Sequence, residues 1–170
     1  HNLYQDSQAL DISYLVTDYP VDFLLGAVEL KAGIMIPTPK LQQKILESLA
    51  LGRNVSLHNA NYSIVSNPYS SRFQNCTEHV LDLIFSSLYD TDSLPQIKAN
   101  QHAYFKAHAI EISPFKRLLA PMFRSDINMQ DQGDDIRIAT FTSISQFLND
   151  YGLLESVAVL DKEGVQPRVK

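Results

Sequence analysis

The chain has 170 residues, a length that suits a single domain with a core of its own. Its formal net charge of −5 at pH 7 disfavours a nucleic-acid or anionic-membrane partner, since both carry dense negative charge. The single cysteine excludes an intrachain disulfide framework and a cysteine-rich zinc site, and no stretch approaches the roughly 18 apolar residues of a membrane span. We expect one domain over residues 1–165 and a polar tail over 166–170.

The first half of the chain predicts short strands and helices in alternation. Asp18 and Pro20 are residue types that begin a helix, and Gly52 is one that follows its end. The expected elements are a strand end over residues 1–4, a short mixed segment over 10–17, a helix over 20–25, a strand over 29–37, an amphipathic helix over 38–51 and a strand over 61–65.

The second half predicts a helix of about fifteen residues behind Cys76, because apolar residues recur there at helical spacing. A turn-rich loop over 67–71 leads to it. The remaining expected elements are a strand or helix over 103–112, a helix over 113–122, an exposed polar loop over 125–135, a strand over 136–141, a helix capped by Ser143, a last strand over 157–160 and a frayed end after residue 162. Together these elements indicate an α+β fold.

Cys76 is the residue that most suggests chemistry. It follows Asn75, a favourable N-cap, and directly precedes the apolar helical pattern. The free N–H groups and the dipole of a helix N-terminus lower the pKa of a thiol, and the same N–H groups can stabilise an oxyanion. The pattern therefore favours a nucleophilic cysteine. The alternative is that the only cysteine is a small buried apolar residue.

Residues 62–76, which read YSIVSNPYSSRFQNC, resemble a bacterial family catalogued as domain of unknown function 2145, which looks like a circularly permuted branch of the papain-like, NlpC-type superfamily. The likeness extends to residues 1–5, 18–23 and 157–161. Residues 75–79 are also similar to the Asn-Cys-Glu-His run of lecithin retinol acyltransferase-like enzymes. The spacing after the cysteine differs by one residue there, so only Cys76 corresponds.

The resemblance implies a central antiparallel sheet packed by helices and a cysteine nucleophile. It also implies a catalytic histidine that precedes the cysteine, on a strand, and a polar residue on the following strand that orients it. The family carries this histidine in a Ser-His-Ala-Gly-like segment, which the sequence lacks. We therefore expect the base upstream of residue 1, on a missing N-terminal part or on an N-terminal fragment of the same precursor as a second chain. His1 would then be the orienting residue.

Other candidates would line the site or compete for a role in it. Gln74 could donate to an oxyanion beside Asn75, and Tyr62 and Tyr69 could present phenols near the thiolate, although packed aromatic side chains are the commoner alternative. His79 follows Cys76 by one helical turn, a geometry that rarely suits proton transfer. The spacing of the other histidines and of the acidic loop fits no common metal site, so we expect no metal and no cofactor.

These observations predict a papain-like cysteine hydrolase or acyltransferase that acts on an amide, peptide or acyl bond, in the cell wall or in a lipid. The alternative is a catalytically inactive binding or assembly module of the bacterial envelope on the same fold. A lesser alternative is a redox sensor that pairs its thiol between molecules. The resemblance implies a location in the periplasm or cell envelope.

Overall fold

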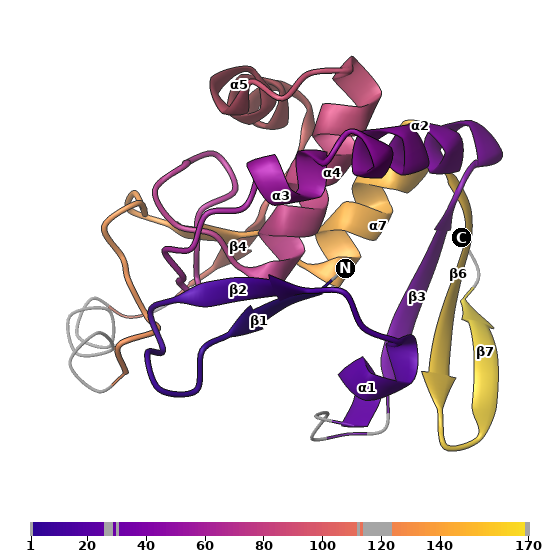
Figure 1. The fold of residues 1–170 in the computed structure, drawn as a ribbon, viewed down its shortest axis with the longest axis horizontal. Helices are drawn as coiled ribbons and strands as arrows, with labels where there is room; N and C mark the ends of the chain where they lie inside the picture. The colour runs from indigo at the N-terminus through magenta and orange to yellow at the C-terminus, as the bar shows by residue number, and fades with distance from the viewer. Residues whose placement is uncertain (1, 26–28, 30, 112, 114–123, 169–170) are drawn as a thin grey trace.

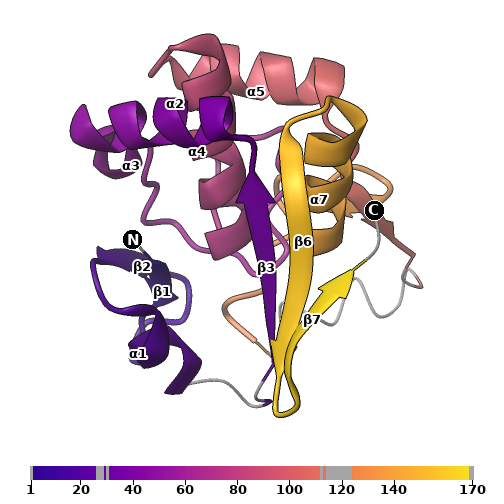
Figure 2. The same cartoon turned by 90° about the vertical axis from the view of Figure 1, so that its right-hand side faces the viewer.

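A computed structural model describes residues 2–25, 29, 31–111, 113 and 124–168 (Figure 1). It contains helices and three small antiparallel sheets, which confirms the predicted α+β class, although the strands do not form the single central sheet that we expected. Figure 2 shows one sheet with helix α7 behind it, the helices α2 and α5 above it, α4 beside β3, and a separate hairpin near the lower end of α4.

The hairpin consists of β1 (Asn2–Gln5) and β2 (Ser13–Val16), paired antiparallel. β1 contacts α4, and in the described part of the chain only β2 pairs with it, so β1 is an edge strand. Just before β2, Ile12 forms an isolated antiparallel bridge with Asn61, and the next residue, Tyr62, forms a parallel bridge with Gln74. The strand expected over 61–65 is reduced to these bridges, because the chain turns at once where the Ser66 N–H donates to the Ser63 carbonyl.

The second sheet has the order β3 (Ala32–Pro37), β6 (Leu154–Asp161) and β7 (Gly164–Arg168). The prediction of a frayed end after residue 162 is wrong, because β7 pairs with β6 along its whole length. Gly164 has φ +108° in the connecting turn, a conformation that favours glycine and lets the chain reverse. The tight turn brings β7 next to β6, so backbone pairing forms a strand there despite the polar residues of β7.

Helix α4 (Cys76–Tyr89) is the centre of the core and confirms the helix predicted behind Cys76. Its side chains Leu81 and Phe85 are completely buried. Around it lie α2 (Pro39–Ala50), the short α3 (Arg53–Ser56), α5 (Leu94–Tyr104) and α7 (Phe141–Asp150), whereas α1 (Pro20–Leu25) follows the hairpin and lies away from α4 (Figures 1 and 2). The buried residues that surround α4 include Leu41, Leu57, Ile97, Phe105, Ile144, Phe147, Leu148 and Val157.

Two helices differ from expectation for identifiable reasons. α5 was not predicted, because its buried face holds Ile97 with the polar Lys98 and Gln101 and shows no apolar period. α7 begins one turn before the position expected: Thr140 is the N-cap, and Ser143 completes a capping box with it instead of capping the helix itself. Both differences arise where polar side chains stabilise the structure: Lys98 and Gln101 on the buried face of α5, and Thr140 with Ser143 at the start of α7.

The third sheet pairs β4 (His108–Ile110) with β5 (Ile136–Ile138). The segment 103–112 thus holds the end of α5 followed by a short strand. The helix expected over 113–122 lies outside the described residues, apart from position 113. The loop over 125–135 is irregular as predicted, yet it is not wholly exposed, because Asp126 is completely buried.

Candidate functional site

Cys76 is the first residue of α4, and its side chain reaches solvent. The N-cap predicted at Asn75 is confirmed: its Oδ1 accepts from the Glu78 N–H at 2.9 Å and from the Thr77 hydroxyl at 2.8 Å. The Asn75 amide also donates to the Ile64 carbonyl at 3.1 Å. These bonds hold the start of the helix, and with it the thiol, against the loop that contains Tyr62 and Ile64.

The pKa of the Cys76 thiol is raised above its ordinary value, which corrects the expectation of a lowered one. Desolvation by the surrounding protein is the larger cause, although the residue itself reaches solvent. The backbone N–H groups of Thr77 and Cys76 act in the opposite direction and are outweighed. The helix N-terminus alone therefore does not activate this thiol, and a nucleophilic Cys76 needs a base or a cation as partner.

Tyr62 is the predicted lining residue that the structure brings to Cys76. It is buried, and burial raises its pKa to about 12, with further increases from the negative charges of Cys76 and Asp126. Arg124 opposes this shift. The Arg124 guanidinium binds Asp126 through both oxygens, at 2.9 and 2.6 Å, and Gln5 of β1 donates to the same carboxylate at 3.1 Å. No local sequence pattern pointed to this ion pair near Tyr62.

Gln74 is buried, and its amide group is fully engaged. Its Nε2 donates to the Leu57 carbonyl at 3.0 Å and to Asp82 at 2.8 Å, and its Oε1 accepts from the Asn59 N–H at 3.0 Å. Both amide hydrogens are thus used within the fold, which leaves none for an oxyanion. Gln74 instead connects the loop before Cys76 to a buried charged network on α4.

That network joins Glu78, Asp82 and Lys98. The Lys98 ammonium lies 2.6 Å from Glu78 Oε1 and 2.7 Å from Asp82 Oδ1, and all three residues are buried. Gln101 adds a donor to Asp82 at 2.8 Å. Burial raises the pKa of Glu78 to about 8, and the nearby Asp82 raises it further, against the opposing effect of Lys98. Burial therefore favours the protonated form of Glu78, which would bring the net charge of the network close to zero.

The carboxyl groups at positions 78 and 82 offered a signal that the sequence reasoning missed. They lie one turn apart in an otherwise apolar helical pattern, where charged residues are rarely buried unless paired. The network fixes the first two turns of α4 and supports the position of Cys76 from behind. It is built for structure, since its polar atoms face each other inside the core.

The described histidines are not hydrogen-bonded to Cys76. His79 is 4% exposed, neither of its ring nitrogens has a partner among the described residues, and burial lowers its pKa to about 4. Its ring meets that of His58 edge to face at 6.2 Å, and His58 Nε2 lies 3.2 Å from the Ser13 hydroxyl. The candidate His1 lies outside the described residues.

Tyr69 occupies a structural position away from the thiol. Its hydroxyl donates to the Phe105 carbonyl at 2.9 Å and accepts from the Ala107 N–H at 3.0 Å, while its ring packs on His102. Tyr69 thereby holds the end of α5 to the loop before Cys76. Of the two predicted tyrosines, the structure places Tyr62 at the site and Tyr69 in the core.

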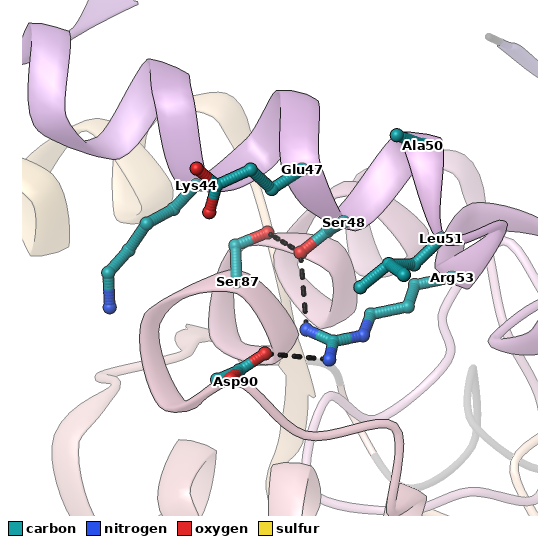
Figure 3. Close-up of a pocket in the computed structure, with 8 residues that line it drawn as sticks. All are labelled: Lys44, Glu47, Ser48, Ala50, Leu51, Arg53, Ser87 and Asp90. Carbon is teal, nitrogen blue, oxygen red and sulfur yellow. Dashed lines mark hydrogen bonds and ion pairs between the residues drawn. The ribbon is translucent and has the colours of Figure 1, made fainter.

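A hollow of about 520 Å³ lies at the other end of α4, between α2 and α3 (Figure 3). Figure 3 shows the Ser48 hydroxyl between Ser87, at 2.9 Å, and Arg53, whose guanidinium also binds Asp90 at 2.7 Å. Arg53 and Asp90 pair with each other, Lys44 donates to the Leu88 carbonyl, and Glu47 accepts from the Gln43 amide. The hollow is therefore a gap between packed helices, and it does not extend the site of Cys76.

Two kinds of feature are absent from the described residues. They contain no group of three or more histidine, cysteine, aspartate or glutamate side chains placed to hold a metal ion. No helix among them is both long and apolar enough to cross a membrane.

Comparison with known proteins finds one family. The model of a family described as "Uncharacterized protein conserved in bacteria (DUF2145)" matches residues 1–148, which cover both β1 and the whole of α4 with Cys76. The searches of the curated proteins and of the solved structures found no match.

Proposed function

Because the chain belongs to the bacterial family DUF2145, we propose that it is a papain-like cysteine hydrolase or acyltransferase in which Cys76 is the nucleophile. The observation that carries the proposal is the position of Cys76: an exposed thiol at the first residue of a 14-residue helix whose body is buried. A nucleophile in this position is held rigidly and remains accessible to a substrate.

The proposed reaction proceeds through an acyl-enzyme. The Cys76 sulfur attacks the carbonyl carbon of an amide, peptide or ester, and the thiol proton passes to a histidine. The backbone N–H of Cys76 stabilises the oxyanion, the histidine returns the proton to the leaving group, and a thioester remains on Cys76. Water or a second acceptor then releases the acyl group and restores the thiol. A cell-wall peptide or a lipid acyl group in the periplasm or envelope is the proposed substrate.

We place the general base on a strand that would pair with the free edge of β1. β1 contacts α4, and Gln5 at its end binds Asp126 beside Tyr62, so this hairpin borders the site. A histidine from a neighbouring strand would approach the thiol from there, and His1, which precedes β1 in the sequence, is the residue proposed to orient it. No described residue places a cation beside the Cys76 thiol, and the thiol pKa is accordingly raised. This supports a base on a segment other than the described ones, since a nucleophilic thiol needs such a partner.

The test is the pH dependence of Cys76 alkylation by iodoacetamide, measured by mass spectrometry on the 170-residue chain and on a version extended upstream. We expect an apparent thiol pKa well below about 8.5 in the extended protein and above it in the shorter one. Incubation of the extended protein with p-nitrophenyl acetate should leave an acetyl group on Cys76, and Cys76→Ser should leave none. A thiol that stays inert in both proteins until they unfold would refute the enzyme.

The raised thiol pKa also favours a second candidate, an inactive papain-like binding or assembly module of the envelope. In that case Cys76 is a packing residue, and Cys76→Ala would leave every interaction of the protein unchanged. The alkylation experiment separates the two candidates directly.

A further inference from the structure

Three helices end with a tyrosine at the same place on the surface. Tyr89 is the last residue of α4, Tyr104 is the last residue of α5, and Tyr151 is the C-cap of α7. Their exposed fractions are 42%, 46% and 53%, which is high for aromatic rings in contact with one another. In Figure 2 the end of α5 lies next to the end of α7, at the far end of α4 from its first residue.

The rings form an open corner. Tyr89 and Tyr104 are nearly parallel, with centroids 6.2 Å apart, and Tyr104 and Tyr151 meet at 87° with centroids 6.3 Å apart. Phe147 lies 5.1 Å from Tyr151. We call these four side chains the tyrosine corner. Together with Leu88 and Leu153 they line a hollow of about 260 Å³, and Tyr104, Phe147 and Tyr151 continue into a second hollow of about 560 Å³.

Two properties of the tyrosine corner favour a positively charged ligand. Aromatic faces carry partial negative charge and attract a cation within about 6 Å of the centroid. Tyr104 and Tyr151 stand at 87° to each other with centroids 6.3 Å apart and both line the smaller hollow, so a cation inside it lies beside two aromatic rings of different orientation. In addition, three helix C-termini, each with a partial negative charge, meet here.

The charged groups nearby are mostly compatible with a cation. Neither α4 nor α7 has a basic residue in its last turn, whereas α5 has His102, whose ring packs on Tyr69. Lys44 reaches the last turn of α4 from α2, and Asp150, Lys106 and His108 line the second hollow. The residues that line the smaller hollow are leucines and aromatic residues, and none of them is charged. A cation that binds there must therefore also carry apolar groups that contact this lining.

We propose that the tyrosine corner binds an alkylated ammonium ion, such as the trimethylammonium group of choline. The methyl groups fit the apolar lining, and the diffuse charge is attracted by the ring faces without the desolvation cost of a primary amine. A free small molecule and a lipid headgroup share this chemistry. The corner is separated from Cys76 by the length of α4, about 20 Å for 14 residues, so the site is independent of the proposed nucleophile.

The test uses choline and its uncharged isostere 3,3-dimethylbutan-1-ol, with binding followed through the methyl protons by saturation-transfer NMR. We expect saturable binding of choline and at least tenfold weaker binding of the isostere. Each of the variants Tyr104→Leu and Tyr151→Leu should weaken choline binding about three- to tenfold, whereas Tyr104→Phe retains it. Tyr19→Leu, at an exposed tyrosine of another surface, is the matched control and should bind as the wild type does.

Phosphatidylcholine vesicles, added in the same series, distinguish a headgroup from a free ligand. Cys76→Ala should leave choline binding unchanged, so a failure of the proposed enzyme does not affect this result. Equal binding of choline and the isostere would overturn the proposal, because it would mean a purely apolar pocket. Absence of saturable choline binding by the wild type, or binding of a neutral N-acetylglucosamine oligosaccharide at the same tyrosines in its place, would overturn it as well.

Discussion

Glu78→Gln should make the protein less sensitive to alkaline pH. The wild-type carboxyl group is completely buried, and its pKa rises from 4.5 to about 8 because burial penalises its charged form. A group with a raised pKa in the folded state stabilises the fold fully below its unfolded pKa, and this stabilisation is lost as the pH rises through the folded value. Glutamine has the shape of the protonated acid, and its Oε1 can still accept from Lys98.

The magnitude follows from linkage at 1.36 kcal/mol per pKa unit. Between pH 6.5 and about pH 9 the free energy of unfolding of the wild type should fall by about 2 kcal/mol through Glu78 alone. The window begins at 6.5 because the folded His79, whose pKa is about 4, is neutral there, and the unfolded imidazole, whose ordinary pKa is 6.5, adds only about 0.4 kcal/mol as it loses its remaining charge. Lys98, whose pKa is raised from 10.5, stays protonated throughout.

Urea denaturation followed by far-ultraviolet circular dichroism at several pH values measures this directly. Wild type should lose stability across the window, and Glu78→Gln should remain nearly flat. Glu155→Gln, at an exposed position on β6, is the matched control and should reproduce the wild-type decline. Equal slopes in wild type and Glu78→Gln would show that Glu78 is already ionised in the fold, and the proposed proton balance of the network would be wrong.

Three further changes have defined outcomes. In the Glu78→Gln background, which removes the opposing change from Glu78, His79→Phe should abolish a loss of about 2 kcal/mol between pH 7 and pH 5, since the buried imidazole of pKa about 4 resists protonation while the unfolded one accepts it; denaturation at both pH values checks this. Asn75→Ala should cost about 1–2 kcal/mol by thermal melting, and Asn75→Asp should recover most of that as a cap. Gly33→Ala should cost about 1–3 kcal/mol, because the new Cβ would lie 2.6 Å from the ring of Phe141; Phe141→Leu in the same chain should recover part of it.

The sequence predicted those elements whose apolar residues or caps are local. Asn75 and the apolar run behind Cys76 identified α4, and the spacing before Gly52 identified α2, since both depend on residues close in the chain. α5 escaped prediction because its buried face contains Lys98, which is stable there only through Glu78 and Asp82 on another helix. An ion pair between two helices cannot be deduced from the sequence of one of them.

The sequence predicted the central residue of the candidate site, Cys76, but not the residues that surround it. The position of Cys76 at a helix start follows from neighbouring residues, whereas the ion pair of Arg124 and Asp126 reaches Tyr62 from more than 60 positions along the chain. The raised thiol pKa is likewise a property of the assembled protein, since it depends on how closely other segments surround the sulfur. The role of Gln74 changed for the same reason, because Leu57 and Asp82 take up both of its amide hydrogens.

The stretch by which the family is recognised ends at residue 148, inside α7, while β6 begins at Leu154. β6 is nevertheless the middle strand of its sheet, and Leu154 and Val157 belong to the core around α4. A protein cut at the family boundary would leave β3 without its partner and expose apolar side chains of the helices. The part of this chain that forms a complete sheet and core is therefore longer than the part by which the family is recognised, and a gene fragment for this protein should extend through the hairpin of β6 and β7.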